Sequence, residues 1–230
     1  MGNWALRNFG RELLPETAFI VAGTTPIKYQ KEILSLFDNV LFRKDAVSHN
    51  FIATYKGKDY AIIFHVYGAP LAIDIIYTLN DGGCKNVIFL GYAYSETLSI
   101  GDYFIPTKTY CFDGLTNLLQ KNIKYSYPDY NLKERIMLTL KKNDILFKKG
   151  HSVSVSSLFH RTKKIRLRVG KINALEMELS SIYYFSKKLK IKSAGLLIIS
   201  DTKEEHLYNG KKIRSEAMKK MFSLLLSNFT

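Results

Sequence analysis

The chain has 230 residues, of which 47% are hydrophobic and 23% are charged, and its formal net charge is +14. This is the balance of a globular protein with one sizeable core, so we expect a single domain over residues 1–230. Two cysteines, Cys84 and Cys111, are too few for a disulfide scaffold, and strand-length apolar runs are too short to span a bilayer.

These features together predict where the chain works. Residues 1–16 contain no long apolar stretch, so we expect no signal peptide. Two thiols outside any CxxC pair are typical of a reduced, intracellular protein. We therefore expect a soluble, cytoplasmic protein with no membrane partner. The positive charge would attract nucleic acid and phosphate-bearing small molecules equally well, although a solvated, lysine-rich surface is the simpler explanation.

The predicted elements alternate along the chain. Apolar or alternating runs predict strands at residues 17–22, 50–55, 60–66, 86–90, 103–105, 107–110, 153–158 and 193–200. Apolar faces with start or stop signals predict helices at residues 26–36, 71–79, 132–142, 175–189 and 213–226.

Continuous apolar strands that alternate with helices predict an α/β fold whose sheet is covered on both faces. Ligands of such folds bind at the carboxyl ends of the strands. The turns expected there are Gly23-Thr24-Thr25, Gly68-Ala69, Gly91-Tyr92 and Ser200-Asp201.

Three segments carry a more specific pattern. The first is ATYKGK at residues 53–58, which leads to HVYGAP at residues 65–70. The second is GGCKNVIFLG at residues 82–91, followed by IGDYFIP at residues 100–106. The third is LEME at residues 175–178 with IISD at residues 198–201.

Together these segments resemble the nucleoside phosphorylase family, which includes purine nucleoside phosphorylases, methylthioadenosine phosphorylases and nucleosidases, and uridine phosphorylase. The resemblance implies a mixed central sheet flanked by helices on both faces. It implies cleavage of the N-glycosidic bond of a purine nucleoside or a 5′-modified relative in nucleotide salvage, by phosphorolysis or hydrolysis. Phosphate is then a candidate co-substrate, and neither another cofactor nor a metal is expected.

Cleavage of this bond passes through an oxocarbenium-like transition state, and the departing base must accept a proton. The resemblance assigns the acid to Asp201, with Ser200 beside it near the base. Arg214, thirteen residues later, matches an arginine that helps the acid transfer its proton. Without the resemblance, Asp201 would cap a following turn and Arg214 would be a solvated charge in the first turn of a helix.

The resemblance also supplies the nucleoside contacts. Glu178 matches the carboxylate that binds the ribose 2′- and 3′-hydroxyls, and such charge-assisted hydrogen bonds are strong. Met177 and Tyr67 are expected on the ribose side, whereas Glu176 and Phe159 are expected near the base, where the ring of Phe159 would stack. The alternatives are acidic residues in a first helical turn and ordinary core methionine and phenylalanine side chains.

The first loop of the expected phosphate site departs from the family pattern. Phosphorylases use backbone N–H groups and an arginine in this loop. Here the loop opens at Gly23, Ile27 stands where the arginine is expected, and Lys28 is the adjacent cation. The glutamate that nucleosidases use as a base is also absent between residues 23 and 28.

The second loop departs as well. Phe89 stands where a second arginine is expected, and Tyr92 follows Gly91 where a serine or threonine would donate to phosphate. Arg43 and His49 are near the region from which a neighbouring subunit supplies a third cation. These departures leave two alternatives open, an enzyme that uses phosphate or water and a catalytically degenerate nucleoside-binding or partner subunit.

The resemblance implies a homo-oligomer, namely a hexamer, trimer or dimer, in which a neighbour completes the pocket. Nucleic acid is an alternative partner on the net charge alone. Because neither an RNA-binding aromatic motif nor a helix-turn-helix signature is present, we do not expect it.

Overall fold

A computed structural model of the chain describes residues 3–23, 26–43, 48–120, 122–157, 172–203 and 211–229, with the backbone alone for residues 211–214. The described helices are α1 (Trp4–Phe9), α2 (Ile27–Leu34), α3 (Gly68–Asp81), α4 (Leu115–Leu119), α5 (Tyr130–Lys142), α7 (Leu179–Lys188) and α8 (Lys211–Asn228). None of them is long and apolar enough to cross a membrane.

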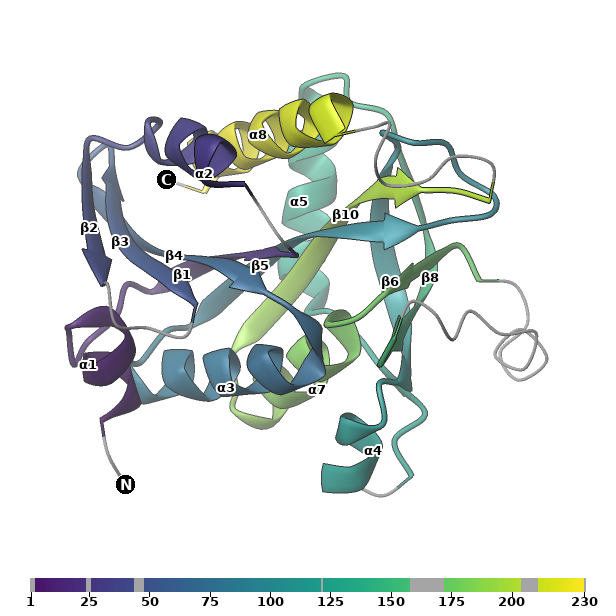
Figure 1. The fold of residues 1–230 in the computed structure, drawn as a ribbon, viewed down its shortest axis with the longest axis horizontal. Coiled ribbons are helices and arrows are strands. Elements are labelled where there is room, and N and C mark those ends of the chain that lie inside the picture. Colours follow the sequence, from purple (N-terminus) through teal and green to yellow (C-terminus); the bar gives the residue numbers. More distant parts are fainter. Residues whose placement is uncertain are drawn as a thin grey trace.

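The strands form one mixed sheet. They are β1 (Thr17–Ala22), β2 (Asn39–Arg43), β3 (His49–Tyr55), β4 (Lys58–Val66), β5 (Asn86–Tyr94), β6 (Tyr103–Phe112), β7 (Tyr125–Ser126), β8 (Phe147–Val155), β9 (Ala174–Glu176) and β10 (Lys192–Asp201). Their order is β10-β6-β8-β9-β5-β1-β4-β3-β2, and β10 also pairs with β5. Strands β5, β10, β6, β8 and β9 therefore close into a ring, from which the other strands extend (Figure 1).

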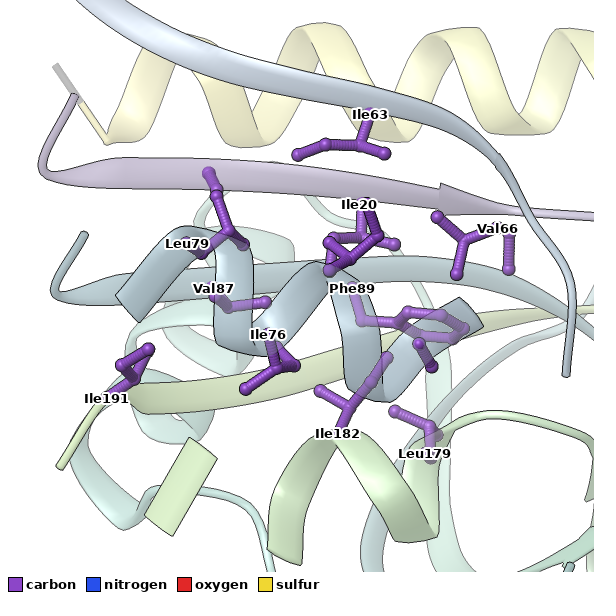
Figure 2. Close-up of a cluster of buried hydrophobic side chains, with 14 of the residues drawn as sticks. Ile20, Ile63, Val66, Ile76, Leu79, Val87, Phe89, Leu179, Ile182 and Ile191 are labelled. Carbon is purple, nitrogen blue, oxygen red and sulfur yellow. The ribbon is translucent and has the colours of Figure 1, made fainter. Parts of the chain in front are cut away.

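Helices cover both faces of the sheet, which confirms the predicted fold class. Helices α1, α3 and α7 lie on one face, and α2, α5 and α8 lie on the other (Figure 1). A hydrophobic core lies on each face of the sheet. Neighbouring residues of β1 pack into different cores, because successive side chains of a strand point to opposite faces. Ile20 packs with Ile76 and Ile182 beneath the sheet (Figure 2), whereas Phe19 packs with Phe222 above it.

The prediction that a helix begins at residue 175 was wrong. Residues 174–176 form β9, which pairs with β8 and β5, and the helix begins only at Leu179. The reason is local, because the carboxylate of Glu176 accepts the backbone N–H groups of Glu178 and Leu179 and so caps the helix from outside it.

Other boundaries also moved. Residues 86–94 form one strand that continues through Gly91, because β10 pairs with it as far as Tyr94. The strand predicted at residues 153–158 lies at Phe147–Val155, because β6 pairs with it from Phe147 onward. The two short runs around Pro106 are one strand, β6, whose register with β8 shifts just after the proline. The helix predicted from residue 71 starts at Gly68.

Candidate functional site

Glu178 lies where helices α3 and α7 begin. Its Oε1 accepts a 2.7 Å hydrogen bond from the backbone N–H of Gly68, the first residue of α3. Its Oε2 accepts a 3.3 Å bond from the N–H of Met177, and Glu178 itself is the N-cap of α7. The positive ends of two helix dipoles therefore meet at one carboxylate, which is a favourable place for negative charge.

Glu176 holds the backbone around Glu178 in place. Its Oε2 accepts the N–H groups of Glu178 at 2.7 Å and Leu179 at 2.6 Å. Its Oε1 accepts the hydroxyl of Ser154 on β8, and the Ser154 oxygen in turn accepts the N–H of Ser180 at 2.8 Å. Glu176 thus ties the start of α7 to β8 and orients the segment that carries Glu178.

A third buried carboxylate, Asp113, extends this network, and sequence reasoning missed it. Asp113 accepts the N–H of Thr116 at 2.6 Å and the hydroxyl of Ser180. Thr116 also bonds Ser181 through its hydroxyl at 2.9 Å. Asp113 and Ser180 are 67 residues apart, so no local pattern could have found this contact.

Burial determines the protonation of the glutamate pair. Glu176 and Glu178 are 2% and 5% exposed. Burial raises the pKa of both carboxyl groups, and the nearby charge of Glu176 raises that of Glu178 further. The N–H donors of Gly68 and Met177 oppose the rise at Glu178. The glutamate pair therefore retains a proton at a pH where exposed glutamates are ionised.

Asp201 ends β10 and is 5% exposed. The hydroxyl of Ser200 lies 2.6 Å from its Oδ2, and its backbone carbonyl accepts the N–H of Ser95 at 2.8 Å. Asp201 is in register with Tyr94 on β5, which is in register with Leu175 on β9. Since paired strands lie about 5 Å apart, Asp201 lies on the order of 10 Å from Leu175, the residue that directly precedes the Glu176–Glu178 segment, at the same edge of the sheet.

The other predicted nucleoside contacts divide into three groups. Tyr67 directly precedes Gly68 at the start of α3 and is 55% exposed. Met177 is buried against Val153 and Val155 of β8, which is the environment of a core methionine. Phe159 and the side chain of Arg214 lie outside the described residues, although the backbone of Arg214 is within α8.

Among the described residues, two aromatic rings occupy the region expected to hold phosphate. Gly23 has a φ of +76° and donates to the carbonyl of Val66 at 2.9 Å. The ring of Tyr92 covers it, because Cδ2 would lie 3.6 Å from a Cβ built on Gly23. Phe89 is fully buried in the core beneath the sheet (Figure 2), and its ring fills the space where Gly91 would carry a Cβ.

The candidate cations are dispersed. Lys28 is exposed in the first turn of α2, and Arg43 at the end of β2 lies near Gly10. His49 instead points to Gln30, with 3.0 Å between Nδ1 and Oε1, and Gln30 also bonds His65. In the described segments no group of three or more His, Cys, Asp or Glu residues is arranged to hold a metal.

Comparison with known proteins agrees with this geometry. The sequence model of the phosphorylase superfamily matches residues 18–228. The chain belongs to this superfamily. Among its superfamily relatives is the purine nucleoside phosphorylase DeoD-type 2 of Vibrio vulnificus, 28% identical over 75% of this chain and 74% of the relative. The DeoD-type purine nucleoside phosphorylase of an Exiguobacterium species is 25% identical over 93% of this chain and 90% of the relative.

Solved structures share the fold. The 5′-methylthioadenosine/S-adenosyl homocysteine nucleosidase of Campylobacter jejuni superposes with a TM-score of 0.81 at 18% sequence identity. The superposition covers 94% of this chain and 98% of the nucleosidase chain. The purine nucleoside phosphorylase of Toxoplasma gondii in complex with immucillin-H has the same TM-score and identity, with coverage of 94% and 90%. The mixed sheet with helices on both faces is thus the fold of these solved proteins.

Proposed function

We propose that the chain cleaves the N-glycosidic bond of a purine nucleoside or a 5′-modified relative. The observation that carries this proposal is the carboxylate of Glu178, buried at the joined starts of α3 and α7 and at the same sheet edge as Asp201. The relatives named as purine nucleoside phosphorylases support it.

In this proposal Glu178 binds the ribose 2′- and 3′-hydroxyls. Both hydroxyls donate, and donors favour the ionised form of a carboxylate. Because burial raises the pKa of Glu178, nucleoside binding in this proposal releases a proton. Glu176 acts as a positioning residue through the N–H groups that it holds.

Asp201 is the acid that protonates the departing base, and Ser200 orients its carboxyl group through the 2.6 Å contact. Arg214 assists the proton transfer. Phe159 stacks on the base, and Met177 and Tyr67 contact the sugar. These roles follow from the matched family positions together with the location of Asp201 and Glu178 at one sheet edge.

The nucleophile is phosphate or water. Phe89 is buried and the Tyr92 ring lies over Gly23. Strands β1 and β5 contain no arginine that could neutralise a phosphate dianion, and an uncompensated anion is costly to bury. These features count against ordinary phosphorolysis, and the absence of a glutamate between residues 23 and 28 counts against ordinary hydrolysis as well. The proposed nucleophile region is Gly23, Lys28, Gly91 and Tyr92.

The same two features favour a second candidate, a catalytically degenerate nucleoside-binding or partner subunit. Release of purine base from adenosine, inosine and methylthioadenosine, with and without phosphate, tests both candidates. Base release supports the enzyme. Tight nucleoside binding in a calorimeter without any base release over days supports the binding subunit, and neither binding nor release rejects both.

The wider setting is proposed on the same basis. The chain acts as one domain over residues 1–230, in the cytoplasm, as a homo-oligomer engaged in nucleotide salvage. Its partner is the small-molecule nucleoside, and it needs no cofactor beyond phosphate if phosphate is the co-substrate.

A further inference from the structure

Ser95 joins the two halves of the candidate site. It directly follows β5 and is 1% exposed. Its backbone N–H donates to the carbonyl of Asp201, at the end of β10, at 2.8 Å. Its hydroxyl donates to the carbonyl of Asn173, the residue before β9, at 2.6 Å. One residue therefore bonds both the strand that ends in the proposed acid and the strand that leads to the proposed ribose anchor.

The bond to Asn173 matters because β9 is short. The strand has three residues, and in the described part of the chain it pairs with β5 at one position, where Leu175 lies opposite Tyr94. The hydroxyl of Ser95 thus adds a second attachment where the backbone alone provides little. β9 ends in Glu176, whose carboxylate holds the N–H of Glu178.

Asn173 is fixed on its other side by β8. Its N–H donates to the carbonyl of His151 at 3.0 Å, and its Oδ1 accepts the N–H of His151 at 3.1 Å. Gly150 leaves room for this arrangement, because a Cβ there would overlap Oδ1 of Asn173. The start of β9 that Ser95 holds is therefore a defined point at which β5, β8 and β9 meet.

Ser95 also has a local role in the loop that follows β5. Its hydroxyl oxygen accepts the N–H groups of Thr97 at 3.1 Å and Leu98 at 3.0 Å, as serine oxygens often do in turns. This role uses the hydroxyl as an acceptor. It does not explain why the hydroxyl donates its proton to Asn173, which is 78 residues away in the sequence.

We infer that Ser95 is a positioning residue that sets the placement of Glu178 relative to Asp201. The inference rests on the proposed function, in which Glu178 holds the ribose while Asp201 protonates the base on the other side of the bond that breaks. A displacement of about 1 Å between such groups can reduce the rate about 100-fold. Ser95 acts through the backbone segments that it bonds and does not need to touch the nucleoside.

The variant S95A removes the hydroxyl but keeps the backbone N–H that reaches Asp201. Base release is measured with whichever of adenosine, inosine and methylthioadenosine the unaltered protein cleaves fastest. We expect kcat of S95A to fall at least about 10-fold with a smaller change in KM, because the alignment is lost while the separate contacts remain.

T78V is the matched control. It also removes a buried hydroxyl that donates to a backbone carbonyl, that of Asp74, but near the end of α3 that lies away from Gly68. T78V is expected to keep the kcat of the unaltered protein. Equal kcat in S95A and T78V overturns the inference.

A double-mutant cycle separates positioning from a general loss of structure. If Ser95 acts through the placement of Glu178, its hydroxyl should matter less once the Glu178 carboxylate is gone. The fall in kcat/KM caused by S95A is therefore expected to be at least about 3-fold smaller in an E178Q background than in the unaltered protein. A loss of folded protein would reduce both rates by the same factor, so strict additivity overturns the inference.

Amide hydrogen exchange tests the bond itself and needs no nucleoside. We expect the N–H groups of Glu178 and Leu179 to exchange at least about 5-fold faster in S95A than in T78V or the unaltered protein, because the segment opens more readily. S95C, whose thiol is a weaker donor, is expected to lie between S95A and the unaltered protein, and it serves if S95A does not fold.

Exchange in both Ser95 variants as slow as in the unaltered protein overturns the inference. An unaltered protein that releases no base contradicts the proposed function, whereas the exchange measurement still decides whether Ser95 holds the segment that carries Glu178. The two failures are therefore distinguishable.

Discussion

The backbone N–H of Gly68 donates to Oε1 of Glu178 at 2.7 Å, across 110 residues of sequence. This contact joins the first residue of α3 to the N-cap of α7 and holds a carboxylate at the start of both helices. The proposed ribose site depends on this junction, and the first three predictions test it.

Removal of the charge at Glu178 should abolish most of the activity. In E178Q the amide still accepts the Gly68 N–H, but it loses two charge-assisted bonds to the ribose, each worth about 1.5–3 kcal/mol. We expect kcat/KM for base release to fall at least about 100-fold. The control E134Q changes a surface glutamate that pairs with Lys133 and should keep its activity. Equal rates for the two variants would remove Glu178 from the site.

The raised pKa of Glu178 gives stability a definite pH dependence. In the unfolded chain the carboxyl titrates near its ordinary pKa of about 4.3, whereas burial raises the folded value. Between the two values the folded state binds more protons, so the free energy of unfolding decreases as pH rises through the raised pKa. Stability from this group is fully present below the ordinary pKa.

Urea unfolding at several pH values checks that sign. E178Q lacks the titrating group, so its free energy of unfolding should decrease less between pH 5 and pH 9 than that of the unaltered protein. D74N, at an exposed position on α3, is the control and should follow the unaltered protein. Parallel profiles for E178Q and the unaltered protein would contradict the assignment.

Gly68 is needed for its backbone conformation. Its φ is +75°, where a side chain is strained. G68A should therefore lose about 1–2 kcal/mol of stability and should also displace the N–H that reaches Glu178, which raises the KM for nucleoside. G83A is the matched control, because Gly83 has a φ of +81° and open space around it but lies just beyond the C-terminal end of α3. G83A should lose stability without a change in KM. The same KM in G68A and G83A would contradict the role of the Gly68 N–H in positioning Glu178.

Phe89 and Gly91 should behave as a coupled pair. A Cβ at Gly91 would overlap the Phe89 ring and approach Leu197 at 3.1 Å. G91A should cost about 1–3 kcal/mol through overpacking. In an F89L background the ring tip is gone, so the added cost of G91A should be smaller by at least about 0.5 kcal/mol. Thermal or urea unfolding of the four proteins gives this coupling, and strict additivity would mean that the ring does not fill the space.

Much of the fold could be predicted because its signals are local. The buried strand at residues 17–22 and the strand that ends at Asp201 are continuous apolar runs bounded by turns. The third motif indicated that Glu178 and Asp201 belong together, and the strand register brings their segments to one edge of the sheet.

The remainder depends on contacts between distant residues. Helical spacing continues smoothly through Glu176, so only the pairing of β9 with β5 and β8 shows that the helix starts later. The bond between Asp113 and Ser180 and the bond between Ser95 and Asn173 arise from the packing of separate elements. The alternation of side chains along β5 predicts that Phe89 is buried beneath the sheet. The close approach of its ring to Gly91 could be found only from the position of the ring in the structure.

The central claim is that Asp201 protonates the base during N-glycosidic cleavage. It is tested most directly by purine base release from adenosine, inosine and methylthioadenosine at high enzyme concentration, comparing the unaltered protein, D201N and the exposed-site control D74N. We expect release by the unaltered protein and by D74N, and a decrease of at least about 100-fold in D201N, within the range of general acid catalysis. Equal release by D201N, or no release by any of the three proteins, would contradict the account.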